Sequence, residues 1–370
     1  MNFDRLTSYL DSLREAEEIP GSACLVLRDH KTVYSHTEGF SDAAGTVPVT
    51  LEDQYLLYSA TKPLTAVAAM QLVEAGKLKL SDPIGDLLPE FRSMRVGDAP
   101  ARNAITVEHL LTMCGGFDYN LGIEPIQEVC RNNPNATTAE IIAALAKAPL
   151  HFEPGTRFCY SLCLDVMARV IEVVSGRTFG QYMKEHLFDP LGMADSGFSI
   201  EKATRLTQQY EYRSEAGGPV AVPNTNGLVP TPRYESGGAG LVSTITDYGK
   251  FVEAMCNGGV GRSGARILSA QSVAAFRVNR LGPVQLADFA GCNKPGYGYG
   301  LGMRVLLEKE KSGAKSPLGE FGWDGAAGAY LMIDTEHRLG IVYTQQVLGR
   351  DVANIIHTHI RNLVYEILGL

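Results

Sequence analysis

The segment Tyr55-Leu56-Leu57-Tyr58-Ser59-Ala60-Thr61-Lys62 passes from an extended run into Ala-, Leu- and Val-rich sequence that ends at Gly76. This change predicts a strand-to-helix corner with Ser59 at the start of the helix. Serine and lysine three positions apart on a helical turn project from one face, and a lysine in an apolar pocket loses part of its preference for the charged form. Such a lysine can accept the serine proton, and the amides of the first turn point toward the nucleophile. The segment therefore predicts a nucleophilic Ser59 with Lys62 as its general base.

The spacing alone supports this hypothesis weakly, because it occurs twice more, at Ser199–Lys202 and Ser312–Lys315. Roughly one such match is expected by chance in a chain of this length. Ser199 is typical of a helix cap, and Ser312 lies in polar sequence between two predicted strands. Only Ser59 stands at a strand-to-helix corner with an apolar helix behind it, and the alternative is a plain capping serine.

Strand-forming sequence lies at both ends of the chain, and mostly helical sequence fills the middle. The predicted strands are 22–28, 32–39, 296–303, 329–333 and 339–345. Helices are predicted at the N-terminus and at the C-terminus, where the apolar face runs from Val352 to Ile367. We expect an α/β (α+β) fold whose antiparallel sheet is built from both chain ends and flanked by the terminal helices. Residues 1–76 and 291–370 would form the sheet domain and 77–290 a mainly helical one, with the active site between them.

The composition is that of a globular protein with a sizeable core: 370 residues, 45% hydrophobic and 20% charged. The net charge of −8 disfavours nucleic acid as a partner. No apolar run approaches the roughly 20 residues of a membrane span, and the N-terminus lacks a signal segment. The 7 cysteines are scattered without paired spacing, which is typical of free thiols. We therefore expect a cytoplasmic protein.

Two further segments supply candidate site residues. Tyr160 follows Pro154-Gly155 and precedes a predicted helix, so its phenol would serve beside a lysine as an anion or as a hydrogen-bond relay. The segment 321–328, Phe-Gly-Trp-Asp-Gly-Ala-Ala-Gly, precedes the late hairpin, and its small residues let a strand edge approach a ligand and direct an N–H at it. Trp323 would wall a pocket. The alternatives are a packing tyrosine and a core tryptophan beside a glycine bulge.

The order and context of these three segments resemble the serine β-lactamase and penicillin-binding protein (DD-peptidase) superfamily, most closely class C β-lactamases and family VIII carboxylesterases. The resemblance covers nearly the whole chain and includes Gly76–Pro83, Ile105–Thr112 and Ser236–Thr244. It implies a β-lactamase/transpeptidase-like fold. It also implies that Ser59 is the acylated nucleophile, Lys62 the general base and Tyr160 the proton shuttle, and that the backbone amides of Ser59 and Ala326 form the oxyanion hole.

Two departures from the family pattern narrow the substrate. The usual Tyr-x-Asn motif is Tyr160-Ser161-Leu162 here, and leucine cannot hydrogen-bond a substrate amide. The usual Lys-Thr-Gly or His-Thr-Gly motif is Trp323-Asp324-Gly325, which lacks the cation that holds a substrate carboxylate, and Asp324 would repel one. We expect Leu162, Trp323, Asp324 and Gly325 to contact the substrate. Both departures favour a neutral ester, and Asp324 would favour a positively charged substrate or acceptor.

The resulting expectation is a serine hydrolase that cleaves esters of small or medium acyl chains through an acyl-enzyme on Ser59. The alternatives are β-lactamase, DD-peptidase or D-aminopeptidase activity, acyl transfer to an alcohol or amine, and a penicillin-binding or sensing relative without turnover. The expected partner is a small-molecule ester or amide. No organic cofactor or metal is implied.

Overall fold

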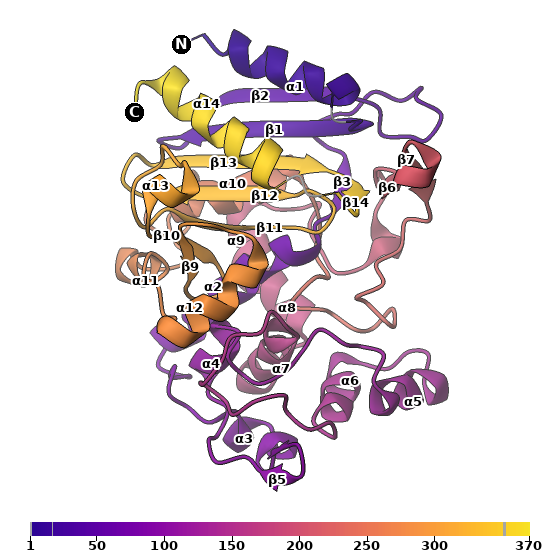
Figure 1. Ribbon diagram of the computed structural model, residues 1–370, viewed down its shortest axis with the longest axis vertical. Coiled ribbons are helices and arrows are strands. Elements are labelled where there is room, and N and C mark those ends of the chain that lie inside the picture. Colours follow the sequence, from indigo (N-terminus) through magenta and orange to yellow (C-terminus); the bar gives the residue numbers. More distant parts are fainter. Residues whose placement is uncertain (1, 17, 351–352) are drawn as a thin grey trace.

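The fold is organised around one antiparallel sheet that joins the two ends of the chain (Figure 1). The computed structural model describes residues 2–16, 18–350 and 353–370. Its main sheet has seven strands in the order β2-β1-β13-β12-β11-β10-β9. The strands are β1 (Gly21–Arg28), β2 (Lys31–Gly39), β9 (Tyr297–Tyr299), β10 (Arg304–Leu306), β11 (Phe321–Asp324), β12 (Tyr330–Asp334) and β13 (Leu339–Gln345). The predicted sheet built from both chain ends is confirmed.

One predicted strand is shorter than expected. The segment 296–303 forms β9 only as far as Tyr299, and the chain then turns at Gly302, whose φ is +71°. The Gly302 amide donates a hydrogen bond to the Leu111 carbonyl at 2.7 Å. The glycines at alternate positions therefore serve a tight turn and close packing as well as a strand.

Both faces of the sheet are covered by helices. Alternate residues of a strand point to opposite faces, and in β1 Cys24 and Val26 pack under α1 (Asp4–Ala16) and α14 (Thr358–Leu368). Leu25 and Leu27 face the other way, where α10 (Ile245–Cys256) packs against β1 and β13. Strands β1, β12 and β13 are thus buried on both faces, which explains why their sequence is apolar with little alternation, whereas the edge strand β2 is polar and only partly covered.

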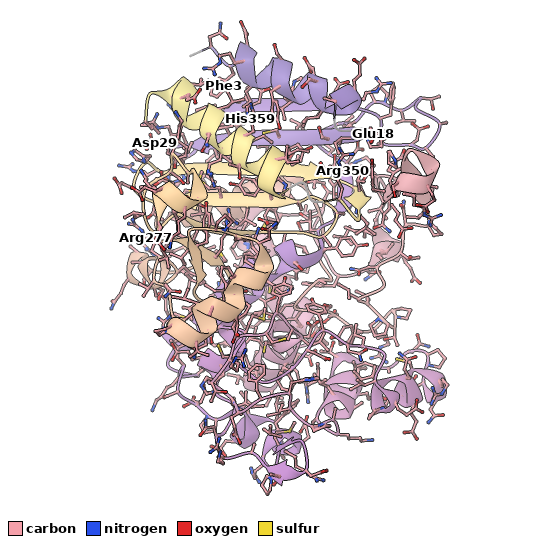
Figure 2. The ribbon with its side chains drawn as sticks, in the orientation of Figure 1. Phe3, Glu18, Asp29, Arg277, Arg350 and His359 are labelled. Atoms are coloured by element: carbon pink, nitrogen blue, oxygen red, sulfur yellow. The ribbon has the colours of Figure 1, made fainter. Side chains whose placement is uncertain are left out.

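The terminal helices hold each other as well as the sheet. The ring of His359 on α14 lies 4.1 Å from that of Tyr9 on α1. Arg350 pairs with Glu18 at 3.1 Å, which ties the segment before α14 to the segment after α1 (Figure 2). A short π-helical turn (Ala353–His357) leads into α14. Val352, the first apolar position predicted for this helix, lies outside the described residues.

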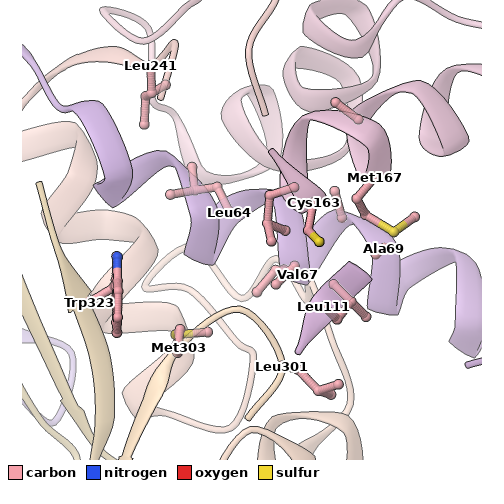
Figure 3. Packing of buried hydrophobic residues seen from close by; sticks show 14 of the residues in the cluster. Leu64, Val67, Ala69, Leu111, Cys163, Met167, Leu241, Leu301, Met303 and Trp323 are labelled. Carbon is pink, nitrogen blue, oxygen red and sulfur yellow. The ribbon is translucent and has the colours of Figure 1, made fainter. Parts of the chain in front are cut away.

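Helix α2 (Lys62–Glu74) is the centre of the molecule. Its apolar residues surround the helix on all sides, and Figure 3 shows Leu64, Val67 and Ala69 among the side chains of the main core. Cys163 and Met167 of α7 (Cys163–Ser175) pack against it. The remaining helices are α3 (Ile84–Leu87), α4 (Val107–Leu111), α5 (Glu124–Asn132), α6 (Thr138–Leu145), α8 (Phe179–Met183), α9 (Asp189–Leu191), α11 (Ala270–Ala275), α12 (Pro283–Phe289) and α13 (Lys309–Ser312).

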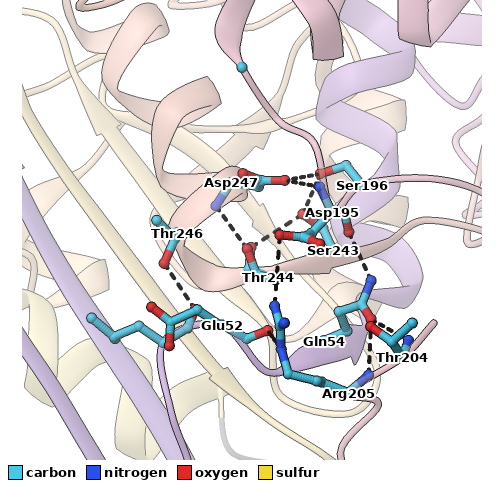
Figure 4. Close-up of polar contacts among 12 residues, drawn as sticks. Glu52, Gln54, Asp195, Ser196, Thr204, Arg205, Ser243, Thr244, Thr246 and Asp247 are labelled. Carbon is cyan, nitrogen blue, oxygen red and sulfur yellow. Dashed lines mark hydrogen bonds and ion pairs between the residues drawn. The ribbon is translucent and has the colours of Figure 1, made fainter.

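Short strands lie outside the main sheet, and several of them interrupt the predicted helical middle of the chain. β3 (Gln54–Leu56) pairs with β8 (Val242–Thr244) immediately before Ser59. A polar network holds β3 in place (Figure 4). The side-chain Nε2 of Gln54 donates to the Asp195 backbone carbonyl at 3.0 Å, and its Oε1 accepts from the Thr204 backbone N–H at 2.9 Å. The other short strands are β4 (Arg95–Val96), β5 (Ala99–Pro100), β6 (Gln209–Arg213), β7 (Gly218–Val222) and β14 (Val347–Leu348).

The helical middle contributes directly to the sheet layer, since α10 covers one face of it. The division into domains 1–76 plus 291–370 and 77–290 stays a prediction. Among the described residues, no helix combines the length and the apolar character needed to cross a bilayer.

Candidate active site

Ser59 lies at the corner that the sequence predicts. β3 ends at Leu56, a single 3₁₀ turn spans Tyr58–Thr61, and α2 follows at once. Tyr58 has a φ of +48°, a left-handed conformation that costs a bulky residue roughly 1–3 kcal/mol. Its hydroxyl donates to the Gln209 side chain at 2.6 Å, which holds the ring in place. The strained residue turns the chain so that Ser59 stands at the head of α2.

Lys62 is wholly buried beneath Ser59. Its Nζ donates to Ser59 Oγ at 3.0 Å, to the Gly238 carbonyl at 2.7 Å and to the Tyr119 hydroxyl at 3.1 Å. Burial lowers the pKa of Lys62 to about 7, although the negative charge of Asp165 acts in the opposite direction. A substantial fraction of the amine is therefore uncharged at neutral pH and able to accept a proton.

Tyr160 joins the same cluster. Its ring lies between those of Tyr119 and Trp323, with centroid distances of 5.6 and 5.5 Å, and Lys62 Nζ is 4.5 Å from its centroid. The phenol oxygen accepts a hydrogen bond from Trp323 Nε1 at 3.0 Å. Burial raises the pKa of Tyr160, and its hydrogen bonds with Ser59 and Trp323 offset only part of this rise. The neutral phenol is thus favoured over the phenolate that the sequence left open.

Tyr119 is a site residue that the sequence analysis missed. It comes from the loop between α4 and α5, accepts the hydrogen bond from Lys62 and also bonds with Ser59. Burial raises its pKa well above the usual value, so it too stays protonated. No local pattern marks a tyrosine in a polar loop, and its contact with Lys62 is visible only after folding.

The glycine-rich segment before β8 supplies the floor of the cluster. The Gly238 carbonyl accepts a hydrogen bond from Lys62. A Cβ at Gly238 would lie 2.4 Å from Asp165 Oδ2 and 2.9 Å from the Tyr119 hydroxyl, so only glycine fits where its carbonyl reaches Lys62. Asp165, on α7, is 1% exposed and accepts hydrogen bonds from Tyr234 at 2.9 Å and Ser236 at 2.5 Å. Burial raises the pKa of Asp165, and Lys62 opposes the rise. No sequence pattern predicted a chemical role for Gly238 or Asp165.

The turn after β11 approaches the head of α2. A Cβ at Gly325 would lie 2.2 Å from the Leu57 carbonyl, so glycine is needed for the two segments to meet. Ala326, the next residue, is exposed, and no residue in the described part of the chain accepts a hydrogen bond from its amide. Its N–H is available to a ligand bound at Ser59.

Asp324 does not present the unpaired negative charge that we expected at the substrate site. Its carboxylate pairs with Lys294 and, at 3.2 Å, with Arg304. Burial opposes ionisation, but these two cations hold the pKa of Asp324 below its usual range. The carboxylate is therefore neutralised by residues 20 and 30 positions earlier in the chain, and the expected preference for cationic substrates loses its physical basis.

The other two expected substrate contacts lie differently. Trp323 is 4% exposed and joins the cluster around Ser59 through its bond to Tyr160. Leu162 is 1% exposed, lies in the hydrophobic core and caps α7 from its N-terminal side. We therefore do not include Leu162 in the proposed substrate site.

Among the described residues, one group of side chains has the geometry of a metal site. It lies on α1 and β2, whereas Ser59 lies before α2. Ligand atoms of Asp11, His36 and Glu38, on α1 and β2, lie within 4.8 Å of one another, and His36 already bonds with Asp11 at 2.7 Å. These side chains are partly exposed. The cluster around Ser59 is built from hydroxyl, amine and indole groups.

A family model described as Beta-lactamase matches residues 6–364. The chain belongs to the beta-lactamase family. The resemblance inferred from the three motifs and the β-lactamase/transpeptidase fold are both confirmed, and the protein is an enzyme of the serine hydrolase type.

Its relatives include a mycobacterial protein and esterases. Protein Rv1367c of Mycobacterium tuberculosis is 32% identical, over 94% of this chain and 90% of that protein. Esterase EstB of Burkholderia gladioli is 27% identical, over 98% of this chain and 94% of the esterase. The solved structure of EstCE1, described as a hydrolase with promiscuous acyltransferase activity, superposes with a TM-score of 0.85 at 26% identity and covers 98% of both chains.

Proposed function

We propose that this beta-lactamase family enzyme is a carboxylesterase that cleaves esters of small or medium acyl chains through an acyl-enzyme on Ser59. The observation that carries the proposal is the buried Lys62 amine, 3.0 Å from Ser59 Oγ, with its pKa lowered to about 7. A neutral amine at this distance is a general base poised at neutral pH.

Acylation begins when the neutral Lys62 Nζ takes the proton of Ser59 Oγ as this oxygen attacks the ester carbonyl carbon. The carbonyl oxygen becomes an oxyanion, which the backbone N–H groups of Ser59 and Ala326 stabilise. The position of Ser59 at the head of α2 and the unused amide of Ala326 support this pair of donors.

Collapse of the tetrahedral intermediate breaks the bond to the leaving alcohol, which must receive a proton. The Tyr160 phenol donates it and regains one from the Lys62 ammonium, since both groups hydrogen-bond with Ser59 and so converge on the reacting oxygen. The bond between Trp323 Nε1 and the phenol oxygen orients the hydroxyl and stabilises transient negative charge on it. Water then attacks the acyl-enzyme by the same steps in reverse and releases the acid.

The surroundings of Ser59 favour an ester over a β-lactam. The third motif presents the neutral indole of Trp323, and the Asp324 carboxylate beside it is occupied by Lys294 and Arg304. Leu162, where an amide side chain would bind a substrate amide, is in the core. Relatives named as esterases, EstB among them, support the same choice.

A direct test compares kcat/KM for p-nitrophenyl acetate and butyrate with kcat/KM for a chromogenic cephalosporin. We expect the better ester to be preferred by at least about 10²-fold, because the third motif has the neutral Trp323 in place of the cation that binds a cephalosporin carboxylate. Equal rates, or preference for the cephalosporin, would replace the esterase assignment with the β-lactamase or DD-peptidase alternative.

Acyl transfer is a second candidate function. The structurally similar EstCE1 is described as having promiscuous acyltransferase activity, and an acyl-enzyme can be released by an alcohol as well as by water. Product analysis with added small alcohols distinguishes the two fates, since transfer gives a new ester and hydrolysis only the acid. A cytoplasmic location stays a prediction.

Asp165 is a positioning residue whose role can be tested by pH dependence. Its negative charge raises the pKa of Lys62, so Asp165→Asn lowers that pKa. Because the reactive form is the neutral amine, which becomes more abundant as pH rises through its pKa, the acidic limb of kcat/KM moves to lower pH.

The measurement is a pH profile of kcat/KM for the wild type and the Asp165→Asn variant. A suitable control is Asp247→Asn, which removes another buried carboxylate, at the start of α10, and should leave the limb in place. An unchanged limb in Asp165→Asn, or one moved to higher pH, would contradict the assigned role.

A further inference from the structure

A cavity of about 350 Å³ lies under the start of α14, beside strands β9 to β12. Its lining includes Lys294, Arg304, Asp324, Tyr330, His357 and Arg361. None of the proposed catalytic residues lines it. Asp324 nevertheless connects it to the active site, because its neighbour on β11 is Trp323.

The charged groups of this cavity leave one cation without a carboxylate. Lys294 and Arg304 share Asp324, and Arg304 also pairs with Glu320 at 3.2 Å. Arg361 is 3% exposed, yet no Asp or Glu of the described chain forms an ion pair with it. Within the described residues its guanidinium bonds with the Tyr297 hydroxyl at 2.6 Å and with the Asn362 side chain at 3.2 Å. Buried charges in proteins are ordinarily paired, so this guanidinium implies a missing anion.

Three buried polar atoms of the lining also lack hydrogen-bond partners. They are Arg361 Nη2, the Tyr330 hydroxyl and His357 Nδ1, judged against all residues that the structure describes. His357 bonds through Nε2 with the Gly328 carbonyl at 3.1 Å, and burial lowers its pKa to about 4. The ring is therefore neutral with its proton on Nε2, and Nδ1 offers a lone pair. A matching ligand brings oxygens for the donors and an O–H for Nδ1.

We propose that this cavity binds a small oxyanion that carries a hydroxyl, of the hydrogen phosphate or hydroxycarboxylate class. The anion supplies the counter-charge for Arg361, accepts from its Nη2 and from Tyr330, and donates its hydroxyl to His357. The volume suffices, because a water occupies about 30 Å³ of liquid and these anions displace only a few waters.

Trp323 makes binding measurable. It is the only tryptophan of the chain, and the Lys294 ammonium lies 5.5 Å from its ring centroid. An anion in the cavity attracts Lys294 and changes the field at the indole, so the fluorescence of Trp323 changes with occupancy. Binding to the folded state also raises the melting temperature.

The experiment titrates the protein with inorganic phosphate and, in a second arm, with lactate, at ionic strength held constant with sodium chloride. We expect a saturable fluorescence change and a rise in melting temperature with at least one probe, and the arm that responds identifies the class of anion. In Arg361→Gln the Kd rises on the order of tenfold or more, because a charge-assisted contact is lost. The matched control Arg131→Gln removes an exposed arginine of α5 and leaves the Kd unchanged.

Tyr330→Phe provides a second variant in case Arg361→Gln does not fold. It keeps the ring that stacks on His357 at 4.6 Å and removes only a hydroxyl that has no partner. We expect this variant to fold and to bind the responding probe several-fold more weakly. The proposal is overturned if neither probe gives a saturable response, or if the folded cavity variants bind as tightly as Arg131→Gln.

Discussion

Ser59→Ala is expected to lose ester turnover on the order of 10⁴-fold or more, and to lose all covalent labelling by a fluorophosphonate. The reason is chemical: the neutral Lys62 amine acts on the Ser59 oxygen, which lies 3.0 Å from it, whereas the Thr61 hydroxyl at the head of α2 donates to the Tyr58 carbonyl at 2.6 Å. Alanine retains the corner at Tyr58 and removes only that oxygen. The measurements are kcat/KM for a p-nitrophenyl ester and the intact mass after treatment with the reagent.

Ser199→Ala is the matched control, because Ser199 has the same spacing to a lysine but caps a short 3₁₀ turn. The Ser199 side chain makes no capping hydrogen bond, so this variant should be labelled by the fluorophosphonate and should turn over ester like the wild type. A labelled Ser59→Ala protein would show that another serine is the nucleophile. A wild-type protein that takes no label and hydrolyses no ester would instead support a binding or sensing relative.

Lys62→Met is expected to reduce kcat by about 10²- to 10⁴-fold, the range typical for loss of a general base. Methionine fills the buried space left by the lysine side chain but cannot accept the Ser59 proton. The acidic limb of the pH profile near pH 7, which reports the lowered pKa of Lys62, should vanish from the residual activity. The measurement is kcat as a function of pH with a p-nitrophenyl ester.

The control for this variant is Lys202→Met, which changes the exposed lysine of the second Ser-x-x-Lys match. It should keep both the rate and the acidic limb. Near-normal turnover in Lys62→Met, or a residual rate with the wild-type limb, would remove Lys62 from the mechanism.

The local chemistry of the chain was sufficient to predict several of its longer elements, among them β1, β2, β12 and β13. The N-terminal hairpin is an example: Asp29 and His30 have φ values of +48° and +59°, which is the mirror-image turn that joins two tightly paired strands. The antiparallel partners Arg28 and Lys31 flank it. Such turns depend on nearest neighbours, so the sequence alone reveals them. The strand at 296–303 was predicted too long because its turn at Gly302 depends on a contact with distant Leu111.

The site was less predictable, since its contacts join distant parts of the chain. Tyr119 and Gly238 reach Lys62 across 57 and 176 positions. Asp324 was expected to act as a free negative charge, and Lys294 and Arg304 neutralise it. The sequence shows that Asp324 carries a charge. That Lys294 and Arg304 are its counter-ions follows only from the packing of β9, β10 and β11.

The three Ser-x-x-Lys matches show what the sequence determines and what only the tertiary structure decides. By spacing alone they are equivalent, and each provides the same hydroxyl and the same amine. Lys202 and Lys315 remain exposed, while Lys62 is wholly buried beneath Ser59. Water stabilises an exposed ammonium and keeps it charged; burial removes that hydration, and only then does a lysine become a base at neutral pH. The sequence determined which groups were present, and tertiary packing decided which one was deprived of water.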